Sequence, residues 1–465
     1  MMAALYRPTL STGTARAGAG RQLIGAPGPG RGIKGGMATP YPLRLITEDE
    51  LSGLHSVHQH AFHSGPPSDA LLARMQARIE LDRTLGAFDG PVMVGVASVY
   101  SFQMRVPGAL AAVAGVTMVA VLPTYRRRGI LSALMRQQLA DIHARGEATA
   151  ALFASEAGIY RRYGYGRASW HTSYEVHGGE GALAPDAPTD SALRLRLAEP
   201  GAARAELAKV YQAVLDERPG LYARNDSWWD RLLADEPEDR AGASPLRCVI
   251  AEDPAGPRGY ALFSATPSWD GSTFLADSTI SIREVMTADP AAAAAIWADL
   301  LSRDLTTEFR TQLRPVDDPV LYLLADPRRL RPTIADGLWV RLVDVPAALS
   351  QRRYACPVDA VIEVSDDLCG WNQGRWRLTA GGPGWPAPAG QTGGQPPGFA
   401  ATCEPATAAA DITLPVSALG AAYLGGTRLG ALAAAGQVTE LRPGALAALS
   451  AAMSWDPAPW CPLIF

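Results

Sequence analysis

The chain has 465 residues, 48% of them apolar and 19% charged, with a formal net charge of −4. This length is too great for one hydrophobic core and predicts roughly two to four domains. No apolar run reaches the roughly 18 residues that a spanning helix needs, and the charge is mildly acidic, so the sequence argues against a membrane protein and against a general nucleic-acid binder.

Residues 1–36 differ in composition from the rest of the chain. They are rich in glycine, alanine and proline, and they carry five basic residues and no acidic one. Because such a segment cannot bury enough apolar surface to fold, we predict a disordered tail. Without its five positive charges, residues 37–465 carry a net charge of −9, which again disfavours a nucleic-acid partner.

Five cysteines lie in the second half of the chain, and none of them belongs to a CxxC pair. An odd number without paired spacing fits neither a disulfide framework nor a zinc site. A secretory signal needs a continuous apolar segment, and the pair Leu23 and Ile24 in the tail is not one. We therefore predict reduced thiols in a cytoplasmic protein.

Residues 37–183 alternate short strands and helices, which is typical of a layered α/β domain. Apolar residues recur at helical spacing over residues 129–144, and residues 115–122 form a nearly continuous apolar strand. Further helices are predicted over residues 48–60 and 71–81, further strands over residues 91–105 and 149–153, and a short helical turn over residues 160–163.

Three consecutive arginines, Arg126, Arg127 and Arg128, stand at the start of the last long helix of this domain. A helix start carries free N–H groups and a partial positive charge, so each cation there costs about 0.3–1 kcal/mol. A bound anion would remove this cost, and Gly129 would let a phosphate approach the backbone. A solvated basic turn is the alternative. No P-loop and no GxGxxG motif is present, which disfavours a nucleoside triphosphate or a dinucleotide.

A glycine-, proline- and acid-rich linker over residues 178–190 leads into a second block, residues 184–345. In this block a strand over residues 277–287 again runs into a helix, but Asp289 and Pro290 stand at its start. An acid and a missing N–H make a good helix cap and a poor anion site. We predict a structural domain of similar build that binds no phosphate ligand.

Residues 346–465 form a third block. Strand-like stretches over residues 356–366 and 374–380 precede a glycine- and proline-rich loop over residues 381–398. A helical segment follows over residues 444–453, and the chain ends in the apolar sequence WCPLIF. Such an apolar C-terminus is expected to pack at a site from which water is excluded.

Four histidines, His55, His58, His60 and His63, form a local cluster. No cysteine and no nearby pair of carboxylates completes a metal site, and histidines three apart on a helix also serve as ordinary half-buried side chains. We predict no metal.

The sequence RRRGIL after an apolar strand resembles the pyrophosphate loop R-x-x-G-x-G/A of the GCN5-related N-acetyltransferases (GNATs), with Leu131 in place of the last small residue. Together with ASEAGIYRRYGYG and a terminal phenylalanine, it is similar to the enhanced intracellular survival (Eis) family of these enzymes. The segments GWNQGRWRL and LGAAYLGGTRL resemble sterol-carrier domains. The resemblance implies an α/β (α+β) chain with a catalytic GNAT domain (37–183), a degenerate GNAT-like domain (184–345) and a sterol-carrier-like domain (346–465).

The same resemblance implies an acetyl-CoA-dependent N-acetyltransferase that needs no metal. It implies that Tyr160 is the general acid and the carboxylate of Phe465 the general base, and that the assembly is a hexamer. The residues that it assigns to acetyl-CoA are Val119, Ala120, Val121, Arg127, Arg128, Gly129, Ile130, Leu131, Ser132, Ser155 and Glu156.

These residue types suit the chemistry. A tyrosine, with an ordinary pKa of about 10, stays protonated at neutral pH and can protonate a leaving thiolate. Tyr163 and Tyr165 lie beside Tyr160, and the residues alone do not choose among the three or exclude simple core packing. A terminal carboxylate is a weak base unless burial raises its pKa, and an apolar C-terminus also packs without any catalytic role.

The acceptor implied by the resemblance is a primary amine: an aminoglycoside, a polyamine or a lysine side chain of a peptide. Ser64 and Ile464 stand where acidic groups for a polycation would be sought, which argues against an aminoglycoside. The main alternative is a non-catalytic protein that binds CoA or lipid. A second alternative is an acyltransferase that uses a longer acyl chain.

Overall fold

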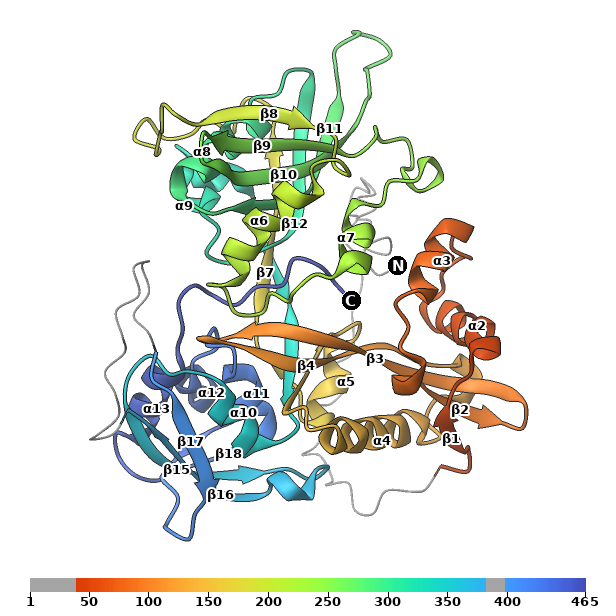
Figure 1. The fold of residues 1–465 in the computed structure, drawn as a ribbon, viewed down its shortest axis with the longest axis vertical. Helices are drawn as coiled ribbons and strands as arrows, with labels where there is room; N and C mark the ends of the chain where they lie inside the picture. The colour runs from red at the N-terminus through yellow and green to blue at the C-terminus, as the bar shows by residue number, and fades with distance from the viewer. Residues whose placement is uncertain (1–38, 382–397) are drawn as a thin grey trace, which may run out of the picture.

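The computed structural model describes residues 39–381 and 398–465. The predicted tail, residues 1–36, and most of the loop predicted over residues 381–398 lie outside the described residues. Within those ranges the chain forms three sheets, each covered by helices, and Figure 1 shows them as three lobes. No helix of the described ranges is both long enough and apolar enough to cross a membrane.

The first sheet has seven strands in the order β1-β2-β3-β4-β5-β14-β6. Its longest strands, β3 and β4, form an antiparallel hairpin through Pro107 and Gly108, whose φ of 68° suits a glycine. The strands are β1 (Leu43–Leu45), β2 (Leu85–Asp89), β3 (Val92–Val106), β4 (Ala109–Val121), β5 (Thr149–Phe153), β6 (Gly166–Arg167) and β14 (Leu338–Leu342), and the helices are α2 (Leu51–Phe62), α3 (Asp69–Gln76), α4 (Ile130–Ala144) and α5 (Ala157–Tyr160).

Helices α2 and α4 cover opposite faces of the first sheet. Helix α2 packs Leu54 against Met93, whereas α4 packs Leu134 against the next residue, Val94. Successive residues of a strand point to opposite faces, so the two helices sandwich β3 between them.

The second sheet also has seven strands, in the order β13-β7-β12-β11-β10-β9-β8. Asp289 caps α8, since its carboxylate accepts hydrogen bonds from the backbone N–H groups of Ala291 and Ala292 at 3.0 Å. The predicted cap is thus confirmed. The strands are β7 (Trp170–His177), β8 (Arg194–Ala198), β9 (Arg247–Asp253), β10 (Gly256–Thr266), β11 (Ser278–Thr287), β12 (Thr306–Arg314) and β13 (Thr333–Asp336), and the helices are α6 (Arg204–Leu215), α7 (Asp226–Leu233), α8 (Pro290–Leu301) and α9 (Val320–Leu323).

The third sheet has five strands in the order β17-β16-β15-β18-β19. Helices on one side of it share a buried cluster with the first sheet. The strands are β15 (Val358–Ser365), β16 (Gly374–Ala380), β17 (Ala401–Pro405), β18 (Ile412–Pro415) and β19 (Thr439–Glu440), and the helices are α10 (Val345–Gln351), α11 (Val416–Ala422), α12 (Leu429–Ala434) and α13 (Ala445–Met453).

The first two sheets exchange strands across the boundary expected at residues 183 and 184. Strand β7 precedes that boundary but pairs with β12 and β13 in the second sheet. Strand β14 follows it but lies in the first sheet, antiparallel between β5 and β6. The two sheets are therefore interlocked along the sequence.

Most predicted elements of the first domain are present, but the bounds predicted for two of them were wrong. Strand β5 and helix α4 match residues 149–153 and 129–144, with Gly129 as the cap of α4. Helix α3 starts at Asp69 and ends at Gln76 instead of spanning 71–81, because the Ser68 hydroxyl caps it by accepting the Leu71 N–H. Strand β4 begins at Ala109, six residues before the predicted start, because the hairpin with β3 extends it.

The third lobe docks closely on the first sheet through α11. An added Cβ on Gly420 would lie 2.2 Å from the carbonyl oxygen of Val340 on β14, and one on Gly166 would lie 1.9 Å from that of Ser417. A buried ion pair, Arg341 Nη2 to Asp366 Oδ2 at 2.6 Å, joins the same surfaces. The first sheet and the third lobe thus form one continuous core.

Replacing Gly420 with alanine is expected to lower the free energy of unfolding by about 1–3 kcal/mol, because the methyl group has no room against β14. Gly430→Ala on α12 is the matched control, since no atom lies within 4 Å of its added Cβ, and it should be neutral or stabilising. Thermal unfolding of both variants checks this. Equal melting temperatures would show that α11 does not dock as closely as described.

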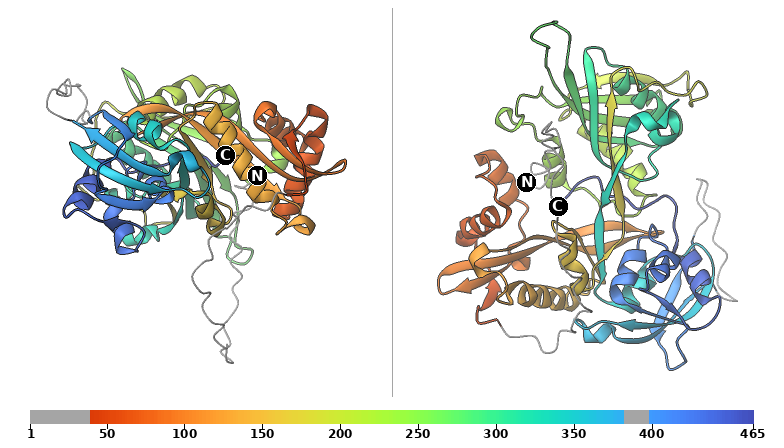
Figure 2. Two further views of the ribbon diagram at one scale, coloured as in Figure 1. Left: turned by 90° about the horizontal axis from the view of Figure 1, so that it is seen from below. Right: turned by 180° about the vertical axis from the view of Figure 1, so that it is seen from behind.

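The end of the chain crosses from the third lobe to the interface between the first and second sheets. Trp460 anchors it, donating its backbone N–H to the carbonyl of Pro219 at 2.9 Å and its ring N–H to the carbonyl of Leu313. Arg218 binds both Asp317 and the carbonyl of Ala458 at 2.7 Å. The views in Figures 1 and 2 place the C-terminus between the two sheets, near α7.

Candidate active site

A cleft opens in the first sheet between β4 and β5. The two strands pair in parallel only from Val113 with Thr149 to Gly115 with Ala151. Beyond that point β4 continues along β3 to Val121, while β5 ends at Phe153. The strands therefore separate and leave the backbone of β4 without a partner on one side.

A β-bulge lies in β4 within this cleft. Val96 of β3 pairs with Ala120 and Ser98 pairs with Thr117, so two residues of β4, Met118 and Val119, stand opposite one residue of β3. Met118 adopts a φ of 51°, in the left-handed region. A bulge leaves backbone groups outside the ladder, and here they lie at the opening of the cleft.

The arginine loop connects β4 to α4 at the other end of the cleft. Arg127 has a φ of 64° and Gly129 one of 81°, and no side chain caps the N–H groups at the start of α4. Arg126 donates to the carbonyl of Ala61 at 3.3 Å and Arg128 to the hydroxyl of Tyr41 at 2.8 Å. Over the described residues none of the three arginines forms an ion pair with a carboxylate.

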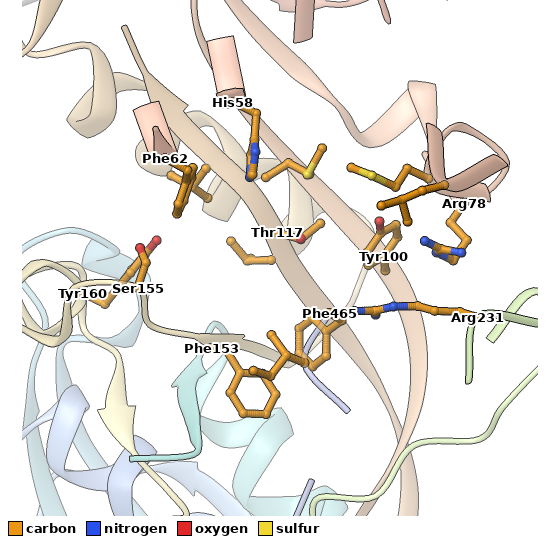
Figure 3. A pocket seen from close by; sticks show the side chains of 16 residues that line it. His58, Phe62, Arg78, Tyr100, Thr117, Phe153, Ser155, Tyr160, Arg231 and Phe465 are labelled. Atoms are coloured by element: carbon orange, nitrogen blue, oxygen red, sulfur yellow. The ribbon is translucent and has the colours of Figure 1, made fainter. Parts of the chain in front are cut away.

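A pocket of about 90 Å³ lies where β4 and β5 diverge. Its lining comes from α2, α3 and the turn after it, β3, the bulged part of β4, the segment from β5 to α5, α7 and the last two residues of the chain. Figure 3 shows Tyr160 and Ser155 at one end and Arg78 and Arg231 at the other, with Thr117 and Tyr100 between them. The first and second domains and the C-terminus thus all contribute to one site.

Three tyrosines follow β5, and their surroundings differ. Tyr160 is buried and lines the pocket, and burial raises its pKa to about 12. The hydroxyl of Tyr163 lies 3.1 Å from that of Ser132. Tyr165 is fully enclosed, and its hydroxyl has no hydrogen-bond partner in the described chain. Of the three, Tyr160 alone lines the pocket.

The last two residues, Ile464 and Phe465, close one side of the pocket. The ring of Phe465 packs against those of Phe102, Phe153 and Tyr222, with centroids 4.7, 5.6 and 6.0 Å away. This aromatic packing holds the terminal residue at the pocket wall.

The other predicted site residues fall into two groups. Val119 and Ser155 line the pocket, whereas Glu156 is exposed at the start of α5 and is not part of the lining. The remaining predicted residues lie along β4 and the start of α4, outside the pocket lining: Ala120, Val121, Arg127, Arg128, Gly129, Ile130, Leu131 and Ser132.

Sequence reasoning missed the arginines of the pocket. Arg78 comes two residues after α3, and Arg231 comes from α7 in the second domain. Tyr100 lies on β3 between them and the pocket centre. No spacing connects these positions, since more than 150 residues separate the two arginines, and only the fold brings them together.

Two of the four clustered histidines, His55 and His58, are buried on α2. His58 lines the pocket and stacks on Phe62, with ring centroids 4.3 Å apart. Burial lowers the pKa of His58 to about 4, so its imidazole is neutral near pH 7. No group of three or more histidine, cysteine or acidic side chains in the described ranges could hold a metal ion.

Family models match all three parts of the chain. A model described as "Acetyltransferase (GNAT) domain" matches residues 42–168, and a second model of the same description matches residues 220–342. A "Sterol carrier protein domain" model matches residues 345–462. These matches confirm the expected fold class of two GNAT domains followed by a sterol-carrier-like domain.

Relatives match over most of the chain. An uncharacterized N-acetyltransferase of Streptomyces avermitilis is 41% identical over 422 residues, which cover 90% of this chain and 98% of the relative. The N-acetyltransferase Eis of Mycobacterium tuberculosis is 34% identical over 378 residues, 80% of this chain and 85% of the relative. The crystal structure of Eis1 from Mycobacterium abscessus superposes with a TM-score of 0.73 at 32% identity, covering 91% of this chain and all of that one. The chain therefore belongs to the Eis family of GCN5-related N-acetyltransferases, a family of enzymes that use acetyl-CoA.

Proposed function

We propose that the protein transfers an acetyl group from acetyl-CoA directly to a primary amine, in the cleft between β4 and β5. One observation carries the proposal: the partly unpaired strand β4 links an arginine loop, which has no carboxylate partner among the described residues, to a pocket that is lined by the buried Tyr160. The arginine loop suits the binding of a pyrophosphate, and the hydroxyl of Tyr160 can protonate a departing thiolate.

The residues around the cleft fit acetyl-CoA. The free N–H groups at the start of α4 and the guanidinium groups of Arg127 and Arg128 would hold the pyrophosphate, and Gly129 leaves room for its approach. The unpaired edge of β4 at Val119 to Val121 offers backbone groups to an extended ligand. Acetyl-CoA supplies the acetyl group as a reactive thioester.

The pocket residues would divide the chemistry between them. The amine nitrogen forms a bond to the thioester carbon while the bond from that carbon to sulfur breaks. Tyr160, kept protonated by burial, gives its proton to the departing sulfur. The carboxylate of Phe465 takes the proton that the amine loses. Backbone N–H groups at the bulge of β4 would polarise the carbonyl oxygen.

A double substitution of Arg127 and Arg128 by glutamine tests the anion site. We expect the KM for acetyl-CoA to rise about tenfold or more, because each guanidinium that contacts a phosphate adds charge-assisted hydrogen bonds. The kcat at saturating acetyl-CoA should change little, since neither arginine lines the pocket that contains Tyr160. Arg145→Gln, at the far end of α4, is the matched control. An unchanged KM in the double variant would refute the assignment of the loop.

The identity of the amine and the hexamer stay predictions from the resemblance, and the cytoplasmic location stays a prediction from the cysteine pattern. Steady-state kinetics with a set of amines, read through release of the CoA thiol, test the reaction itself. Retention of CoA without thiol release for any amine would favour a binding protein over an enzyme.

A further inference from the structure

The wall of the pocket that faces away from Tyr160 carries two guanidinium groups. Arg78 lies in the turn after α3, and Arg231 lies on α7 of the second domain. Figure 3 shows their side chains on the same side of the pocket, with the ring of Tyr100 beside Arg78 and that of Phe465 beside Arg231. Both side chains are half-buried.

Neither arginine has a carboxylate partner among the described residues. Both pack on the ring of Trp228, with guanidinium carbons 5.6 and 5.2 Å from its centroid, and the Nε of Arg78 is buried without a hydrogen-bond partner. Burial lowers the pKa of Arg78, which is the expected cost of an uncompensated charge.

Two other arginines, Arg74 and Arg224, do form ion pairs with carboxylates. Arg74, one turn earlier, forms ion pairs with Glu236 and Asp239. Arg224, fully buried in the second domain, has Glu284 at 2.5 Å. The two arginines of the pocket differ from these neighbours in having no carboxylate partner among the described residues, whereas buried charges in proteins are normally paired.

The lining of the pocket contains no aspartate and no glutamate. His58 is neutral near pH 7, and the hydroxyl of Tyr100 is neutral too, because burial raises its pKa. Even with the negative charge of the terminal carboxylate counted, the two arginines leave the lining with a net positive charge. A polycation would be repelled from such a site.

We propose that the acceptor is a small primary amine that also carries an anionic group, and that Arg78 and Arg231 bind this group while the amine faces the acetyl donor. The proposal rests on the proposed function and narrows its acceptor. Guanidinium groups bind carboxylate and phosphate alike through paired N–H donors, so the shared chemistry is an oxyanion. The pocket, with a volume of about 90 Å³, leaves room for a small linear amine.

The first test compares amines of equal length with and without an anionic end. The probes are linear ω-amino carboxylates and ω-aminoalkyl phosphonates of two to six carbons, the neutral alkylamines of the same length, and a linear diamine. At saturating acetyl-CoA, we expect kcat/KM for the best anionic probe to exceed that of its neutral counterpart about tenfold or more. The two anionic series distinguish a carboxylate from a phosphate. Equal values for anionic and neutral probes, or a preference for the diamine, would overturn the proposal.

The second test removes the arginines one at a time. Arg78→Gln and Arg231→Gln should each raise KM for the anionic probe about tenfold while leaving that for the neutral amine unchanged. Arg231→Lys keeps the charge and should retain part of the preference, and Arg145→Gln, outside the pocket, should retain all of it. A uniform loss for all amines would point to a structural role instead and would contradict the proposal.

The outcomes separate this inference from the function on which it rests. If no amine releases thiol from acetyl-CoA, the proposed reaction fails. If neutral amines or diamines are acetylated at least as well as anionic ones, the reaction stands and the anionic acceptor fails.

Discussion

Replacing Tyr160 with phenylalanine is expected to lower kcat about a hundredfold or more, because the leaving sulfur loses its proton donor. The ring keeps its place, so binding of acetyl-CoA and the thermal stability should stay close to those of the wild type. The burial that raises the pKa of Tyr160 to about 12 keeps the hydroxyl protonated. The measurement is steady-state thiol release, with CoA affinity measured separately by titration.

Tyr165→Phe is the matched control for this prediction. It removes a hydroxyl five residues away that is enclosed and has no partner in the described chain, so it should leave kcat unchanged and should not lower stability. The wild-type pH profile gives a second check. A donor with a pKa of about 12 is protonated below that value, so kcat should not fall between about pH 7 and 10 through loss of the acid. An active Tyr160→Phe variant would remove this residue from the mechanism.

Adding two glycines after Phe465 is expected to lower kcat by a factor of about a hundred, because the terminal carboxylate becomes a peptide carbonyl and can no longer accept the proton of the amine. The aromatic packing of Phe465 and the anchor at Trp460 lie upstream of the addition. The fold, judged by circular dichroism and thermal unfolding, should therefore be retained. Turnover is measured with the best amine of the panel.

A cleavable extension provides the control. The chain is produced as a fusion that releases a free carboxylate at Phe465 on cleavage, and activity is compared before and after cleavage of the same sample. Recovery of kcat on cleavage supports the carboxylate as base. Full activity in the uncleaved fusion contradicts a role of the terminal carboxylate as base. Another base must then be sought in the pocket. His58 would be a weak one, because its pKa is lowered to about 4.

Local signals predicted the parts of the site that lie close together in the sequence. Helix α4 was predicted because its apolar residues recur at helical spacing, and Gly129 stands at its start. The arginine loop was noticed because cations at a helix start conflict with the helix dipole. Each of these signals arises between residues that lie only a few positions apart in the sequence.

Contacts between distant segments could not be predicted in this way. Arg78 and Arg231 meet only because α7 of the second domain packs beside the first sheet. Strand β14 lies between β5 and β6, yet its short sequence, Leu338–Leu342, does not specify these partners. The periodicity of a strand predicts which of its side chains are buried, but it does not predict which other strand pairs with it.

The interlocked sheets constrain the order in which the chain can fold during synthesis. Until β14 is made, β5 has no partner on the edge that faces away from the cleft, and β7 has no β13 beside it. Both gaps are filled by neighbouring strands, Thr333–Asp336 and Leu338–Leu342, so the two sheets are completed almost together and late in translation. A nascent chain that stops before this point carries open strand edges, which favour aggregation, and the catalytic domain is not expected to mature as a separate unit.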